Sequence, residues 1–148
     1  MKVGYTRKIT KYPARYPIKV RFSRSVVVGN YVFVSGCSGQ TLETFHADSD
    51  DVEAQTEVAL DKVRAAIEEA GSSMENLVKV IVYLTSAEDR RRVEGRIDDY
   101  YYKYAPRLIR EPPAQTVVCV AGLHEADLLV EIDSIAVIPN SEGQDARF

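Results

Sequence analysis

The chain has 148 residues, of which 45% are hydrophobic and 28% charged, values that are ordinary for one globular domain spanning residues 1–148. The net charge of −3 gives no electrostatic argument for a nucleic-acid or membrane partner. No apolar run approaches the roughly 20 residues of a membrane span, and the amino terminus lacks the hydrophobic region of a signal peptide. The two cysteines form no CxxC pair and no disulfide framework. We therefore expect a cytoplasmic protein.

The amino-terminal segment is basic. The first 24 residues contain no acidic residue and carry eight cations: Lys2, Arg7, Lys8, Lys11, Arg15, Lys19, Arg21 and Arg24. Residues 1–20 are interpreted either as an arm that touches an anionic partner or as a loosely held, solvated end. The second interpretation is favoured because chain termini are usually poorly ordered. Residues 139–148 are predicted to form a flexible tail for the same reason.

A hairpin is predicted next, with strands at Ser25–Val28 and Tyr31–Ser35 around a Gly-Asn turn. The small residues 35–39 then allow a close approach by a ligand or backbone, although their composition favours a plain turn. His46 follows in a polar loop without the spacing of a metal site, so it is expected at the surface.

The clearest helix is predicted at residues 51–70, with Asp50 as its N-cap, Glu53 completing a capping box and Gly71 ending it. A strand is predicted over 78–84, with Val78 on its apolar face. A second helix is expected from Ser86 to the residue before Pro106. Its tyrosine cluster, residues 100–104, is interpreted as packing on the sheet rather than stacking on bases, since adjacent helical residues point in different directions.

Residues 112–137 are predicted to form two apolar strands, one beginning after Pro113 and one at residues 129–138, joined by a short hairpin loop. His124 lies in that loop and is expected to be a solvated turn residue. Glu131 lies within the second strand, where a carboxylate is costly to bury unless it is hydrogen-bonded. Glu131 is therefore the first candidate for a functional residue.

These elements predict an α+β fold with a mixed sheet of five to six strands and two helices on one face. The other sheet face is expected to be apolar as well, and a second copy of the chain is its simplest cover. A closed homo-oligomer is therefore expected.

Three stretches, VVVGNYVFVSG, DVEAQTEVALDKVRAAIEEAGSSMENLVKVIVYLT and PPAQTVVCVAGL with VEIDSIAV, together resemble the RidA/YjgF/YER057c/UK114 proteins. The resemblance spans residues 22–137. It implies a chorismate-mutase-like homotrimer with ligand sites in the clefts between subunits. It also implies hydrolysis of reactive imines or enamines, such as 2-aminoacrylate, to 2-oxo acids and ammonia, without metal or organic cofactor.

The resemblance assigns roles to several residues. Glu131 matches the glutamate that orients the attacking water, and Ser35 matches the serine of the family's V-S-G motif. The P-A-R-S/T motif, whose arginine grips the substrate carboxylate, is here Pro113-Ala114-Gln115-Thr116, so the arginine is absent. Phe22 stands near the slot of a family tyrosine. Val117 and Arg24 complete the predicted binding set, with Arg24 a candidate replacement for the missing cation.

The loss of the arginine matters chemically. An arginine offers a charged, bidentate fork to a carboxylate, whereas Gln115 offers neutral donors. Charged hydrogen bonds contribute about 1.5–3 kcal/mol against about 1 for neutral ones, a difference worth roughly tenfold to a hundredfold in affinity. The substrate is therefore expected to differ from that of the arginine-containing members.

The two cysteines are interpreted differently. Cys37 lies in the predicted cleft and is a candidate reactive thiol, although no histidine stands near it in the sequence. Cys119 is expected to be a small buried hydrophobic residue.

Three functions remain open from the sequence. The first is an imine or enamine deaminase-type hydrolase that uses Glu131 and water. The second is a ligand-binding trimer without catalysis, in which Glu131 is structural. The third is an RNA-related, endoribonuclease-like role, which the acidic net charge and the absence of interleaved basic and aromatic residues disfavour.

Overall fold

The structure is a computed structural model that describes residues 6–14 and 20–140. Parts of the predicted basic arm, residues 1–5 and 15–19, lie outside the described residues, as does the predicted tail from residue 141 onward. Within the arm, residues 7–10 form a strand that the sequence analysis did not predict.

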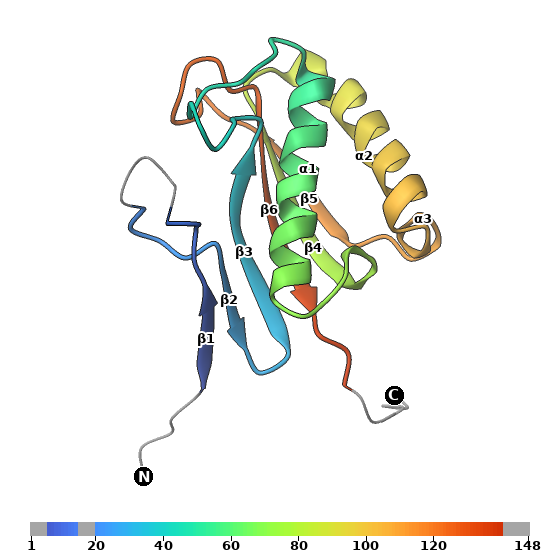
Figure 1. Cartoon of the computed structure of the whole chain (residues 1–148). Helices are drawn as coiled ribbons and strands as arrows, with labels where there is room; N and C mark the ends of the chain where they lie inside the picture. Colours follow the sequence, from blue (N-terminus) through green and yellow to red (C-terminus); the bar gives the residue numbers. More distant parts are fainter. Residues whose placement is uncertain (1–5, 15–19, 141–148) are drawn as a thin grey trace.

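One six-stranded mixed sheet forms the frame of the molecule (Figure 1). Its strands are β1 (Arg7–Thr10), β2 (Ser25–Val28), β3 (Tyr31–Ser38), β4 (Leu77–Leu84), β5 (Ala114–Cys119) and β6 (Val130–Val137). They lie in the order β1-β2-β3-β6-β4-β5, and all neighbours are antiparallel except β4 and β5. The predicted α+β class with five to six strands is confirmed.

Two long helices, α1 (Val52–Glu69) and α2 (Arg90–Tyr104), cover one face of this sheet, and a short α3 (Arg107–Arg110) follows α2 (Figure 1). Short 3-10 helices precede β4 at Met74–Asn76 and α2 at Ala87–Asp89. Gly71 stops α1 at φ +95°, as predicted. The N-cap is Asp51 rather than Asp50, because Asp51 has the extended backbone of a cap and its carboxylate accepts the N–H of Ala54.

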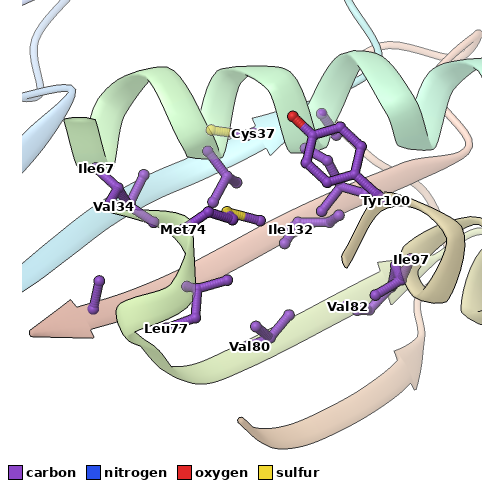
Figure 2. Close-up of a cluster of buried hydrophobic side chains, with 14 of the residues drawn as sticks. Val34, Cys37, Ile67, Met74, Leu77, Val80, Val82, Ile97, Tyr100 and Ile132 are labelled. Atoms are coloured by element: carbon purple, nitrogen blue, oxygen red, sulfur yellow. The ribbon is translucent and has the colours of Figure 1, made fainter. Parts of the chain in front are cut away.

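The core lies between the helices and the sheet (Figure 2). Val80, Val82 and Ile132 point from the sheet toward α1 and α2, and each is at most 1% exposed. Val78 does not join them, because the register of β4 against β6 shifts between Leu77 and Lys79. The irregularity places Leu77 in the core and leaves Val78 exposed, which corrects the predicted face.

The tyrosine cluster divides as its helical spacing requires. Tyr100 and Tyr101 are buried against the core, whereas Tyr102 is 78% exposed. The prediction that the cluster packs on the sheet holds for the first two residues. The three rings do not form one stacking platform.

The predicted hairpin of residues 112–137 is wrong. β5 starts at Ala114 as expected, but it pairs in parallel with β4 at the sheet edge, while β6 inserts between β3 and β4. Strand alternation cannot distinguish a hairpin from a connection that passes over a third strand. Cys119, at the end of this edge strand, is exposed rather than buried.

The face opposite the helices, called the open face below, is apolar at several positions. Ile9, Tyr31, Phe33 and Val118 are 40–51% exposed. Phe33 lies between the buried residues Val32 and Val34, and strand alternation therefore turns it away from the helices. The described chain has no helix on this face (Figure 1).

Candidate functional site

Strand β6 places two carboxylates on the open face. Val130, Ile132 and Ser134 are buried beneath the helices, so Glu131 and Asp133, which alternate with them, point the other way. The Glu131 side chain is 26% exposed. Burial raises the pKa of its carboxyl, and the nearby Asp133 raises it further, while His124 and Lys62 act in the opposite direction. Glu131 therefore holds a proton more readily than an ordinary surface glutamate.

The backbone of β3 approaches this carboxylate at Gly36. The pairing of β3 with β6 is irregular between Val34 and Cys37, and a Cβ at Gly36 would lie 2.2 Å from Oε1 of Glu131. A side chain at position 36 would therefore displace the Glu131 carboxylate from this position. The stretch continues β3 to Ser38 instead of forming the favoured plain turn, and the close-approach alternative describes it better.

Ser35 fixes the segment that precedes the hairpin. Its hydroxyl donates to the carbonyl of Ser23 at 2.7 Å, and its backbone N–H donates to the carbonyl of Arg24 at 3.1 Å. The Ser35 hydroxyl is therefore used in a hydrogen bond within the chain. This bond holds the segment before β2 against β3, the strand that pairs with Glu131's strand β6.

His124 is a neighbour of Glu131 that the sequence analysis assigned to a solvated turn. Its Nδ1 lies 3.8 Å from Oε2 of Glu131, and its Nε2 lies 2.9 Å from Oε1 of Gln40. The side chain is half exposed, as a turn residue would be, yet it forms one wall of the site. Nothing in the local sequence indicates this contact, because it depends on how the long β5–β6 connection folds back.

Tyr83 reaches the same carboxylate pair from the neighbouring strand. Its hydroxyl donates to Oδ2 of Asp133 at 3.3 Å, and the charge of Asp133 is the main reason that the pKa of Tyr83 is raised. The i, i+2 spacing of Glu131 and Asp133 indicates a shared face from sequence alone. The position of Tyr83 beside this pair follows only from the register of β4 against β6.

Gln115 does not join this cluster within one chain. Its register partner on β4 is Val80, whose side chain lies in the core, so Gln115 stands on the helix-covered side of the sheet. There it lines a surface pocket of about 530 Å³ with residues of α2 and α3. Val117 lies on the same side beside Val82 and packs against the core. Glu131 points to the opposite face.

A second, smaller cavity lies behind Gly36. Its volume is about 40 Å³, and its lining residues are Tyr12, Pro13, Arg24, Gly36, Cys37, Ser38, Gln40, Leu42 and Lys62. Burial raises the pKa of the Cys37 thiol to about 12, so the thiol is protonated at neutral pH. This state is unfavourable for the reactive thiol predicted from the sequence.

The remaining predicted residues surround this cavity. Phe22 is 62% exposed and packs edge-on against Tyr12, with ring centroids 5.6 Å apart. Arg24 lines the cavity and also donates to Glu69 of α1 at 2.6 Å. Arg21 is exposed.

In the described residues, no group of three or more histidine, cysteine, aspartate or glutamate side chains is arranged to hold a metal ion. A search of the same residues finds no helix with the length and apolarity needed to span a membrane.

Known proteins similar to this chain identify its family. The family described as Endoribonuclease L-PSP matches residues 12–138. A RutC family protein of Pyrococcus abyssi is 31% identical over 115 residues, which cover 78% of this chain and 84% of that protein. A 2-iminobutanoate/2-iminopropanoate deaminase of Escherichia coli is 29% identical over 116 residues, covering 78% and 86%.

Solved structures of related proteins have the same fold. A member of the YjgF/YER057c/UK114 family from Mycobacterium tuberculosis superimposes with a TM-score of 0.72 at 29% identity, covering 89% of this chain and 99% of that one. Escherichia coli TdcF with bound serine gives a TM-score of 0.75 at 26% identity, covering 88% and 98%. The chain therefore belongs to the Endoribonuclease L-PSP family, that of the RidA/YjgF/YER057c/UK114 proteins.

Proposed function

We propose that this protein is an imine or enamine deaminase-type hydrolase that works in a cleft between the subunits of a homotrimer. Membership of the family supports a small-molecule, deaminase-type role. The observation that carries the proposal is Glu131, a half-buried carboxylate with a raised pKa that faces away from the core beside the backbone of Gly36.

The proposed reaction needs one base and one water. The Glu131 carboxylate accepts a proton from water, the hydroxide oxygen bonds to the imine carbon, and the nitrogen takes that proton from Glu131 to give a carbinolamine. Glu131 then accepts the hydroxyl proton of the carbinolamine and passes it to the nitrogen as the C–N bond breaks, which yields a carbonyl compound and ammonia. A carboxylate with a raised pKa suits both steps, because in each it accepts a proton from oxygen and returns it to nitrogen.

The opposed directions of Gln115 and Glu131 support a shared cleft. Within one chain these side chains stand on different faces of the sheet, so a site that uses both must join two subunits. The apolar open face, with Phe33 and Tyr31 about half exposed, supports self-association. The substrate is then expected to meet Glu131 of one subunit and Gln115 of its neighbour.

Mixing two inactive variants tests this arrangement. Glu131→Gln removes the base, and Gln115→Glu introduces a negative charge that disrupts the part of the cleft contributed by Gln115. Each variant alone is expected to lose ammonia release from 2-iminobutanoate generated in solution. Co-refolded mixtures contain some clefts with both native residues and should regain activity. A mixture that stays as inactive as its components would contradict the shared cleft.

Gln115 in the place of the family's arginine favours one alternative, a ligand-binding trimer without catalysis. A panel of carboxylated and uncharged imines, with single-stranded RNA as a further substrate, separates the possibilities. Ammonia release that depends on Glu131 supports the hydrolase. Saturable binding without turnover supports the binding protein, and RNA cleavage would overturn both.

A further inference from the structure

We propose that the cavity behind Gly36 is a small-anion subsite, in which Lys62 and Arg24 bind a carboxylate. This inference deepens the proposed function, because it gives the substrate a carboxylate that the neutral Gln115 would not hold. The subsite can be tested by measuring ligand binding alone, without any catalytic turnover. The cavity is about 40 Å³ in volume, larger than the roughly 10–15 Å³ that one water needs by the same kind of measure.

Lys62 points from α1 toward the end of β3. Its ammonium donates to the carbonyl of Ser38 at 2.9 Å and also to the carbonyl of Gln40. An ammonium has three donors, and these two carbonyls of the described chain use two of them. The third donor is assigned to the anion. Burial lowers the pKa of Lys62, and a bound carboxylate would offset that desolvation.

Arg24 brings a second positive charge to the same cavity. Its guanidinium is 22% exposed and is held from one side by Glu69. The charges of Lys62 and Arg24 both lower the pKa of Cys37 in the cavity wall, and the charge of Arg24 also lowers the pKa of Lys62. Two cations around one small cavity repel each other unless an anion lies between them. Glu69 pairs with Arg24 but is not among the residues that line the cavity.

The cavity adjoins the carboxylate of Glu131. Gly36 lines the cavity, and its backbone also lies against Oε1 of Glu131. Lys62 and Glu131 are close enough for each to shift the pKa of the other. A small substrate with its carboxylate at Lys62 would therefore extend past Gly36 toward the proposed base.

Calorimetric titration with 2-oxobutanoate tests the subsite directly, because this carboxylate needs no turnover to bind. 2-Butanone, which lacks the carboxylate, is the matched ligand. We expect Lys62→Met to weaken 2-oxobutanoate binding by about ten- to hundredfold, the value of a charged hydrogen bond, while Lys62→Arg retains most of it. Lys103→Met, which removes an exposed lysine of α2, is expected to bind like the wild type. Unchanged affinity in folded Lys62→Met, or no binding by the wild type, would overturn the inference.

A second pair of variants keeps the test decisive if Lys62→Met does not fold. Arg24→Gln and Glu69→Gln break the same ion pair, but only the first removes the cation. The inference requires weaker 2-oxobutanoate binding in Arg24→Gln and equal or tighter binding in Glu69→Gln. Equal losses in the two variants would mean that the ion pair acts only through the fold, and would overturn the role of Arg24.

Failure of this subsite and failure of the proposed enzyme give different results. Lys62-dependent binding without any ammonia release supports the subsite and contradicts the hydrolase. Ammonia release from carboxylated imines with an unchanged KM in Lys62→Met supports the hydrolase and overturns the subsite.

Discussion

The backbone of Gly36 lies directly against the carboxylate of Glu131, so close that an added Cβ would stand 2.2 Å from Oε1. This contact joins the two halves of the proposed site. On one side lie the open-face carboxylates of β6, and on the other lies the cavity with Lys62 and Arg24. The absence of a side chain at position 36 sets the position of the proposed base.

Gly36→Ala is expected to lower activity while leaving the stability of the fold almost unchanged. The nearest atoms are at the far end of the Glu131 side chain, which can rotate away, so the melting temperature should change little. The displaced carboxylate would no longer meet the water, and ammonia release should fall by about the 10²–10⁴-fold typical of a lost general base. Gly122→Ala is the matched control, since a Cβ there meets nothing within 4 Å. Full activity in Gly36→Ala would contradict the assigned position of the base.

Glu131→Gln is expected to stabilise the fold at neutral pH. The folded-state pKa of Glu131 is raised, chiefly by burial, so the folded protein binds more protons than the unfolded chain at pH values between the ordinary glutamate pKa of 4.5 and the raised pKa. The carboxylate therefore lowers the free energy of unfolding as pH rises through that window, and costs nothing below it. Denaturant unfolding at several pH values should show a gain for Glu131→Gln at pH 7 that vanishes below about pH 4. Glu88→Gln, at an exposed site, serves as the control.

A structural Glu131 predicts the opposite result. If the carboxylate satisfied buried donors, its removal would destabilise the protein by about 1–3 kcal/mol per unsatisfied group. Lower stability of Glu131→Gln at neutral pH, with unchanged turnover, would favour the binding protein over the hydrolase.

Local patterns predicted much of the fold, and long-range pairing set the limit. Helix α1 and its stop at Gly71 follow from an apolar stripe and a left-handed glycine, both of which are local signals. The position of β6 between β3 and β4 does not follow from local signals, because the alternation of a strand carries no information about which strands lie beside it. The predicted hairpin of residues 112–137 failed for that reason.

The residues of the candidate site fall into two groups, those that the local sequence indicates and those that only contacts between distant segments bring into the site. Glu131 was identified from the cost of burying a carboxylate in an apolar strand, which needs only the sequence. His124 and Lys62 were missed because their contacts join segments far apart in the chain. The irregular pairing at Gly36 was also beyond local patterns, since the composition of residues 35–39 favours a plain turn.

Cys37 is expected to resist thiol reagents in the folded protein. Its pKa is raised to about 12, mainly by burial, so almost no thiolate exists at pH 8. In Cys119→Ser, a chromogenic disulfide should react only after denaturant is added. Rapid labelling of the native variant would restore Cys37 as a candidate nucleophile.

The open face is expected to form the subunit contact. Phe33 is 45% exposed in β3, and a charge there would be buried in any assembly that covers this face. Phe33→Glu should convert the proposed trimer to monomers in sedimentation velocity at micromolar concentration. Val58→Glu, at a 36% exposed position on α1 outside the pocket of Gln115, should remain trimeric. A wild-type monomer would remove the shared cleft.

The most direct test of Glu131 as the catalytic base is the steady-state rate of ammonia release from 2-iminobutanoate generated in solution. Wild type and Glu131→Gln should be compared at equal concentrations of folded protein. We expect measurable turnover in the wild type and a loss of about 10²–10⁴-fold in kcat for the variant, with 2-oxobutanoate binding retained. Equal turnover in the two proteins would contradict the assignment of Glu131 as the base.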